Sequence, residues 1–299
     1  MTAAYGASVD AKVELVARSS TALVPWWSFI KTLIAACALR LSEQGRLVLD
    51  APVADAPYTL RQLLRHRAGL GDYGDLEDYH AAVARRDPPW SRVELLTRVP
   101  PNRLLFAPDE GWAYSNVGYL IVRRLIEDAC GETLGSVLGR LVLRPLGVEA
   151  AFLAETAADM DLTEFAGGRG YDPSWVYHGT VVGPVAEAAL ALHRILDGAL
   201  LASASLAAML ESHPVGGPLP GRPWQQTGYG LGLMIGTMQR RDMPLAVQVA
   251  GHSAGGPGSV GAVYRRMAPD RAAGTAAVYV SGSSPGAAEN RALAVLTAD

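Results

Sequence analysis

The sequence is poor in cysteine, which limits the chemistry to expect of it. Its two cysteines, Cys37 and Cys130, lie in apolar segments and lack the Cys-x-x-Cys or Cys/His spacing of a zinc site. We therefore expect reduced, buried thiols rather than a disulfide or a cysteine nucleophile. We predict an activity that needs no metal and no organic cofactor.

The chain also lacks an excess of charge of one sign and any long apolar run. Its 26 lysines and arginines nearly balance 29 aspartates and glutamates, for a net charge of -3, which is not typical of a nucleic-acid or anionic-membrane surface. No stretch reaches the roughly 20 apolar residues that cross a bilayer, and the N-terminus has no basic segment followed by an apolar one. We expect a cytoplasmic protein whose partner is a small molecule, not a nucleic acid or a membrane. The oligomeric state is left open.

Apolar residues are plentiful, at 49% of 299 residues, which is enough for a substantial core. Residues 26–45, WWSFIKTLIAACALRLSEQG, repeat apolar side chains at the spacing of one helical face. Residues 118–132 repeat this pattern, with Asn116 as a candidate N-cap and Gly131 just beyond the end. The region 24–210 is therefore predicted to be mainly helical.

After a Pro/Gly-rich break at 213–223, the period changes from helical to alternating. YGLGLMIG, PLAVQVAG, SVGAVYRR and GTAAVYVSG predict antiparallel strands. The last run, AAENRALAVLTA, predicts a helix over one face of their sheet, and the N-terminal AKVELVAR can add a strand. We predict an α/β (α+β) fold in which a discontinuous sheet domain, 1–23 with 211–299, carries an inserted mainly helical domain, 24–210. A cleft is expected where the two meet.

One candidate nucleophile is Ser253, at the centre of a G-x-S-x-G pattern within GHSAGGPGS, residues 251–259. A nucleophile elbow needs a strand before the serine, a helix after it and a histidine later in the chain. Pro257 and its flanking glycines instead lead into another predicted strand, and the last of the six histidines is His252. The elbow interpretation is therefore disfavoured.

A second candidate is the S-x-x-K pair formed by Ser28 and Lys31, which are neighbours on one face if the segment is helical. A partly desolvated lysine of lowered pKa can take the proton of a serine hydroxyl. Lys31 is the only charged residue between Arg18 and Arg40, which disfavours a role in solvent. Taken alone, the pair is more typical of an ordinary helix with an exposed serine and a snorkelling lysine.

Two further segments carry polar groups suited to acyl transfer. Residues 114–116, Tyr-Ser-Asn, offer a phenol and an amide, although a helix cap with a packed ring has the same pattern. Residues 252–255, His-Ser-Ala-Gly, end a predicted strand, where backbone N–H groups can face an oxyanion. For His252 alone, a hydrogen-bonded structural histidine is the alternative.

In this order, S-x-x-K, Y-x-N and a strand-borne H-x-x-G resemble the serine β-lactamase and penicillin-binding-protein superfamily. The resemblance is strongest to its class C-like serine hydrolases, which include esterases and D-amino-acid peptidases. It implies a β-lactamase-like fold, an antiparallel sheet flanked by terminal helices with a large helical insertion. Segments elsewhere resemble the family too: QGRLVLDAPV, TLRQLLRHRAGLGDY, FAPDEGWAYSNVGYLIVRRLIE, RPLGVEAAF and GYGLGLMIG.

The resemblance implies a role for each matching residue. Ser28 would be the acylated nucleophile, Lys31 its partner, and Tyr114 the phenol that moves protons. The backbone N–H groups of Ser28 and Gly255 would form the oxyanion hole. The substrate-binding residues that it implies are Asn116, His252, Ser253 and Ala254.

The third motif departs from the family pattern in ways that bear on the substrate. Ala254 stands where glycine is common, which narrows the space for an acyl group. His252 is mostly neutral at pH 7, whereas a lysine there would be a permanent cation for a substrate carboxylate. We expect an esterase- or D-peptidase/amidase-like serine hydrolase with little β-lactamase activity. The alternatives are an acyltransferase on the same fold, or a catalytically silent ligand-binding or sensor module.

Overall fold

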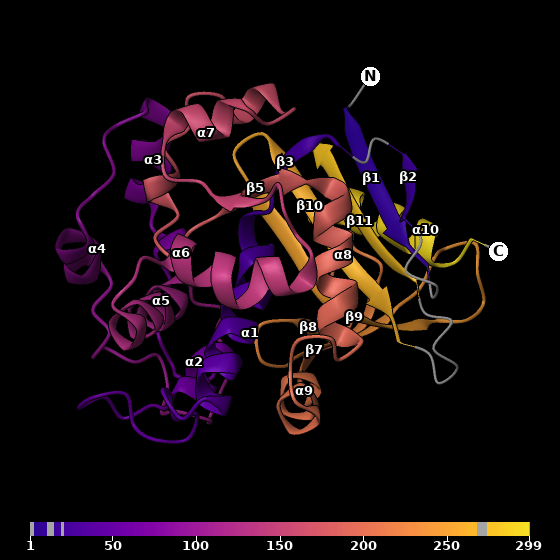
Figure 1. Cartoon of the computed structure of the whole chain (residues 1–299). Helices are drawn as coiled ribbons and strands as arrows, with labels where there is room; N and C mark the ends of the chain where they lie inside the picture. Colours follow the sequence, from indigo (N-terminus) through magenta and orange to yellow (C-terminus); the bar gives the residue numbers. More distant parts are fainter. Residues whose placement is uncertain (1–2, 11–14, 19–20, 268–273, 299) are drawn as a thin grey trace.

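The fold is built around one antiparallel sheet whose strands come from both ends of the chain (Figure 1). The computed structural model describes all residues except 1–2, 11–14, 19–20, 268–273 and 299. The strands of this sheet are β1 (Ala4–Val9), β2 (Leu15–Arg18), β6 (His213–Gly216), β7 (Trp224–Tyr229), β8 (Met234–Met238), β9 (Val247–Gly256), β10 (Ser259–Arg266) and β11 (Thr275–Ser281). Their order across the sheet is β2-β1-β11-β10-β9-β8-β7-β6.

Helices fill the chain between the two groups of strands. They are α1 (Ile30–Glu43), α2 (Leu60–Leu64), α3 (Glu77–Arg85), α4 (Arg92–Arg98), α5 (Asn116–Cys130), α6 (Leu134–Leu138), α7 (Ala157–Asp161), α8 (Val185–Leu196) and α9 (Ser203–Leu210), with α10 (Pro285–Leu296) near the C-terminus. Three short strands, β3 (Leu23–Pro25), β4 (Phe152–Leu153) and β5 (Val181–Pro184), form a second sheet. In the part of the chain described, every helix is too short or too polar to span a membrane.

Each face of the main sheet packs on a different apolar cluster, because side chains alternate along a strand. In β11, Ala277 and Tyr279 belong to the large core that includes α8. Ala276, Val278 and Val280 belong to a smaller cluster with α10. The sheet is therefore covered on both faces, by α8 on the side of the other helices and by α10 on the opposite side (Figure 1).

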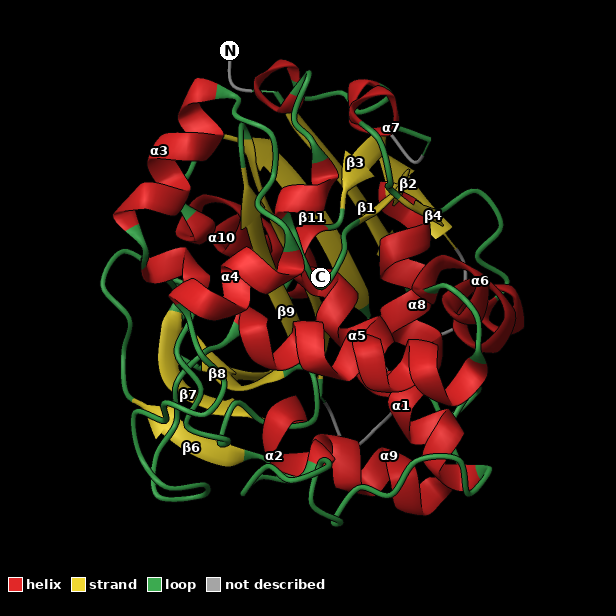
Figure 2. Ribbon diagram, turned by 90° about the vertical axis from the view of Figure 1, so that its left-hand side faces the viewer, coloured by secondary structure: helices red, strands yellow, loops and turns green. Residues whose placement is uncertain are grey.

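Helix α1 lies at the centre of the helical layer, which stands in front of the sheet in Figure 2. Most of its residues are buried, including Lys31 and Cys37, and it packs against α5 and α6. A helix buried on all sides must be apolar all round, which its sequence largely is. Cys37 and Cys130 are both free thiols, and burial raises the pKa of the Cys37 thiol to about 12.

The predicted fold class is confirmed, and the strand predicted over 259–266 is β10 itself. The prediction of one strand over YGLGLMIG is wrong, because β7 ends at Tyr229 and β8 begins at Met234. Gly232, in the intervening turn, has a φ of 78°, a left-handed conformation that glycine adopts easily. Of the predicted strand AKVELVAR, residues 15–18 form β2, and residues 11–14 lie outside the described residues.

The start of α5 also differs from the prediction. Ser115, not Asn116, is the N-cap, and its Oγ accepts from the Gly118 backbone N–H over 3.0 Å. The Asn116 side chain is therefore available for other contacts. The division into domains at 23/24 and 210/211 stays a prediction. Helix α8, from the segment predicted as the helical domain, packs directly on the main sheet.

Candidate active site

Ser28 lies in a 3₁₀ turn, Trp27–Phe29, that leads into α1, and not inside a regular helix as predicted. The difference arises at Trp27, whose φ of 39° is incompatible with a continuous right-handed helix. The Trp27 indole is buried and donates to Ser259 Oγ over 2.9 Å. A β-carbon on Gly256 would lie only 2.6 Å from this ring. The turn that carries Ser28 is therefore packed tightly against the β9–β10 hairpin.

Lys31 is fully buried in the first turn of α1. Its Nζ lies 3.3 Å from Ser28 Oγ and 2.7 Å from Asn116 Oδ1. It also lies 2.9 Å from Nε2 of His178. Burial lowers the pKa of Lys31 to about 7, and the charge of Asp72 opposes this shift. A large fraction of the amine is therefore unprotonated at neutral pH.

Tyr114 faces Ser28 from the loop before α5. Its hydroxyl donates to Ser28 Oγ over 3.0 Å, and Lys31 Nζ lies 4.8 Å from the centre of its ring. Burial raises the pKa of Tyr114 well above its usual range, so the side chain is a phenol at neutral pH. The structure thus brings together the alcohol, the amine and the phenol that the sequence singles out.

The side chain of Asn116 is oriented by Asp72. The carboxylate accepts from the Asn116 backbone N–H and from Nδ2, each over 2.9 Å. Because Nδ2 is used in this way, Oδ1 is left to accept from Lys31. Burial raises the pKa of Asp72, and its hydrogen bonds and Lys31 oppose that rise. The sequence analysis missed Asp72, which there is one of many aspartates in loops.

The third motif lies on β9, which runs into β10 without an intervening helix. His252 is buried, with Nε2 2.9 Å from Tyr229 Oη. Burial lowers its pKa to about 3, so the ring is neutral. Ser253 Oγ is engaged away from Ser28, by Tyr264 Oη at 2.6 Å and by Glu289. Ser253 therefore does not have the geometry of a nucleophile elbow.

Ser28 and Gly255 both line two cavities. The first has a volume of about 410 Å³, and its walls include Ala254, His252 and Arg222. The second has a volume of about 470 Å³. Its walls are rich in aromatic rings: Trp27, Tyr73, Tyr79 and Tyr171. Among the described residues lining either cavity, none is acidic. A substrate can therefore extend in two directions from Ser28.

Arg222, in the first cavity, is neutralised by a residue that the sequence analysis also missed. Glu289 of α10 is completely buried and accepts from both Nε and Nη2 of Arg222. It also accepts from the Trp224 indole over 3.1 Å. In sequence Glu289 looks like an ordinary polar position of a terminal helix. The cavity wall therefore carries little net charge.

All eight predicted site residues lie at these cavities or in direct contact with a residue that lines them: Ser28, Lys31, Tyr114, Asn116, His252, Ser253, Ala254 and Gly255. Among the described residues, no group of three or more His, Cys, Asp or Glu side chains is placed so that it could hold a metal ion. The arrangement of alcohol, amine and phenol is suited to acyl transfer.

Comparison with known proteins identifies the family. A family model described as Beta-lactamase matches residues 3–299. The chain belongs to the beta-lactamase family. Like other members of that family, as the resemblance of its motifs implied, it carries Ser28 and Lys31 in S-x-x-K spacing, with Tyr114 and Asn116 in Y-x-N spacing.

Sequence relatives of this beta-lactamase-family chain include an esterase and a penicillin-binding protein, and an amidase shares its fold. "Esterase EstB" of Burkholderia gladioli is 32% identical over 144 residues, covering 40% of this chain and 36% of the esterase. "Penicillin-binding protein 4*" of Bacillus subtilis is 30% identical over 132 residues, covering 40% of this chain and 28% of that protein. The match thus spans about a third of each relative's length. D-amino acid amidase from Ochrobactrum anthropi SV3, complexed with D-phenylalanine, has the same fold, with a TM-score of 0.77 at 18% identity and coverage of 99% of this chain and 94% of the amidase chain.

Proposed function

We propose that the protein is a serine hydrolase that cleaves an ester or amide through an acyl-enzyme on Ser28. The observation that carries this proposal is the environment of one oxygen: Ser28 Oγ lies 3.3 Å from Lys31 Nζ and 3.0 Å from Tyr114 Oη. A serine hydroxyl is a weak nucleophile by itself, but an adjacent neutral amine can take its proton as it attacks. The lowered pKa of Lys31 provides that amine near pH 7.

The proposed reaction has two steps. Ser28 Oγ attacks the carbonyl carbon while its proton passes to Lys31 Nζ, and the backbone N–H groups of Ser28 and Gly255 stabilise the oxyanion. The Tyr114 phenol protonates the departing alkoxide or amine and regains a proton from the Lys31 ammonium. Water then attacks the acyl carbon as Lys31 takes its proton, the bond to Ser28 Oγ breaks, and the Lys31 ammonium returns the proton to Ser28 Oγ, which releases the acid and restores both residues.

The substrate that this site favours has no essential carboxylate. His252 is neutral, and the Arg222 guanidinium is already paired with Glu289. A substrate carboxylate would therefore lose its water without gaining a free cation. The names of the esterase and of the D-amino acid amidase point to an ester or an amide as the bond that is cleaved. A chromogenic cephalosporin, which carries a carboxylate, is expected to be hydrolysed slowly, and rapid turnover would contradict this part of the proposal.

Covalent labelling tests the proposal. A fluorophosphonate is expected to add its phosphonyl group to the wild type with loss of fluoride, at Ser28, as seen by intact mass and peptide mapping. Ser28→Ala is expected to abolish the adduct, and Ser253→Ala, a matched serine-to-alanine change in the same cavity wall, to retain it. Loss of labelling in Ser253→Ala alone would instead favour the elbow serine.

Two alternatives remain distinguishable by experiment. An acyltransferase would form the same adduct, but an added alcohol or amine would divert the acyl group from water into a new product. A silent binding or sensor module would never be acylated in the wild type. The close approach of Lys31 and Tyr114 to one hydroxyl favours an enzyme over this last alternative.

A further inference from the structure

Three atoms that can form hydrogen bonds surround the amine of Lys31. Its Nζ lies 2.7 Å from Asn116 Oδ1, 2.9 Å from His178 Nε2 and 3.3 Å from Ser28 Oγ. A neutral amine has only two hydrogens and one lone pair. If Asn116 and His178 accept the two hydrogens, the lone pair is left facing Ser28. Whether His178 accepts or donates therefore decides whether the lone pair of Lys31 faces Ser28.

The direction of the His178 contact depends on its tautomer. With the proton on Nδ1, Nε2 accepts a hydrogen from Lys31 and leaves the lone pair for Ser28. With the proton on Nε2, the imidazole donates into the lone pair, and Lys31 can no longer take a proton from Ser28. Tyr73 Oη lies 3.5 Å from Nδ1, where it can accept from an Nδ1–H group. The contact is consistent with the first tautomer, in which Nδ1–H is the donor and Tyr73 Oη the acceptor.

The position of His178 is set by the loop that enters β5. His178 is 2% exposed, and the next residue, Gly179, has a φ of 97° with space for no β-carbon, since one would lie 2.9 Å from Leu153. Arg123 of α5 donates to the carbonyl of Tyr177 over 3.4 Å. The backbone residues on both sides of His178 are therefore in contact with their surroundings, which fixes the place of the imidazole beside Lys31.

We propose that His178 is a positioning residue for Lys31: as the Nδ1–H tautomer it accepts one amine hydrogen at Nε2, and with Asn116 it turns the lone pair toward Ser28 Oγ. No motif of the sequence analysis includes this residue. The inference rests on the proposed function of Ser28 and adds to it the group that orients its base.

The charge around His178 is consistent with a neutral ring. Burial is the main cause that keeps the pKa of His178 well below its usual range, and the positive charges of Lys31 and Arg123 act in the same direction. Asp72 is the acidic group that faces Lys31. The titratable or charged groups that face His178 come from several elements: Lys31, Tyr73, Tyr119, Arg123, and, at longer range, His66 and His252.

A pair of substitutions separates the acceptor from the bulk of the side chain. His178→Leu removes the acceptor, and kcat/KM for an activated ester is expected to fall about 100-fold, as for a misplaced catalytic group. His178→Gln can place an amide oxygen near the position of Nε2, and we expect it to recover most of the loss. The acid limb of the pH profile, which the lowered pKa of Lys31 leads us to expect near pH 7 in the wild type, should move to lower pH in His178→Leu, because an acceptor stabilises the ammonium more than the amine.

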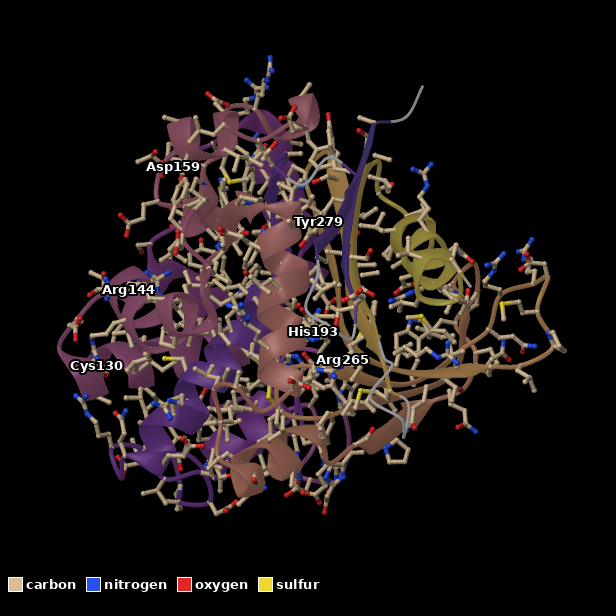
Figure 3. All side chains as sticks on the ribbon, turned by 45° about the vertical axis from the view of Figure 1, so that its right-hand side comes forward. Cys130, Arg144, Asp159, His193, Arg265 and Tyr279 are labelled. Atoms are coloured by element: carbon tan, nitrogen blue, oxygen red, sulfur yellow. The ribbon has the colours of Figure 1, made fainter. Side chains whose placement is uncertain are left out.

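A second buried histidine provides the control. His193 of α8 is also 2% exposed but lies at the sheet beside Arg265 (Figure 3), with its Nδ1 3.1 Å from Thr275 Oγ1. His193→Leu is expected to change the melting temperature without moving the acid limb. Wild-type kcat/KM and an unmoved acid limb in a folded His178→Leu would overturn the inference, as would equal losses in His178→Leu and His178→Gln.

A measurement on the wild type does not depend on how the variants fold. Nitrogen-15 NMR of histidine-labelled protein is expected to show one ring, absent from the His178→Gln spectrum, that stays protonated on Nδ1 and unprotonated on Nε2 between pH 6 and pH 8. An Nε2–H tautomer or an imidazolium at that ring would overturn the inference even if Ser28 is acylated. Failure of fluorophosphonate labelling in the wild type would instead count against the proposed function.

Discussion

At the scale of single residues, the buried amine of Lys31 lowers the free energy of unfolding. Its pKa falls from 10.5 to about 7 on folding because it is wholly buried, so the unfolded chain holds its proton more tightly than the folded one. The resulting loss of stability is complete below about pH 7 and fades as the pH rises toward 10.5. A methionine would fill similar space without this cost. The proposed role of Lys31 as the base for Ser28 accounts for an amine at this position in spite of its cost in stability.

Lys31→Met tests this trade between stability and activity. The melting temperature of the variant minus that of the wild type is expected to be larger at pH 6 than at pH 9, because the cost of burying the lysine is larger at the lower pH. Acylation of Ser28 should fall by about 10²–10⁴-fold, the usual contribution of a general base. Leu33→Met, a substitution at another buried position of α1, is the control. A difference in melting temperature between Lys31→Met and wild type that does not vary with pH would contradict the buried, titrating amine.

At the scale of elements, the sequence predicts those helices and strands that have a regular spacing of apolar residues. The strand over 259–266 follows from its Val-rich run between turns, and the long helical segments follow from their apolar spacing. The turn between β7 and β8 is not predicted, because alternating glycines fit a strand and a turn equally. The N-cap was assigned one residue too late, since Ser115 and Asn116 are both good caps.

The site was predictable only where its residues form local motifs. Ser28 and Lys31 are three positions apart, and Tyr114 and Asn116 are two, so each pair is visible in the sequence. Asp72 and His178 reach the site from loops 44 and 147 residues away from their partners Asn116 and Lys31. A lone aspartate or histidine in a loop has no periodicity that marks it as buried. Only tertiary packing brings such residues to the amine.

The contact between β9 and the turn that carries Ser28 can be tested by substitution. Gly256→Ala places a methyl group 2.6 Å from the buried Trp27 ring, so the ring and the adjacent Ser28 must move. We expect kcat/KM to fall about 100-fold, as for a displacement of about 1 Å, with a smaller effect on the melting temperature. Gly6→Ala in β1 is the matched control, because its methyl group meets only ordinary contacts at 3.6 Å. Similar kcat/KM for both variants would show that the turn is not held by this contact.

At the scale of the whole molecule, segments from near the two ends of the chain complete the main sheet, and the one near the C-terminus also reaches the site. Strand β1, near the N-terminus, pairs with β11 along its whole length, and α10 covers the outer face of the same sheet. Through Glu289, α10 also reaches Arg222 and Ser253 beside the first cavity. The last helix therefore controls the charge of a cavity that is otherwise built by the preceding strands and loops.

Glu289→Gln tests whether α10 sets the charge of the first cavity. The amide keeps the shape of the side chain but leaves the Arg222 guanidinium without its counter-charge, at a cost in melting temperature. The freed cation is expected to raise kcat/KM about tenfold for an ester that bears a carboxylate, relative to an uncharged ester of equal size, since a charge-assisted hydrogen bond is worth about 1.5–3 kcal/mol. The carboxylate is placed in turn on the acyl and on the alcohol part, which also reveals which part occupies the first cavity. Arg222→Met combined with Glu289→Gln should lose the gain. An unchanged ratio for both esters would mean that Arg222 does not act on the substrate, and that the neutrality of the cavity has another origin.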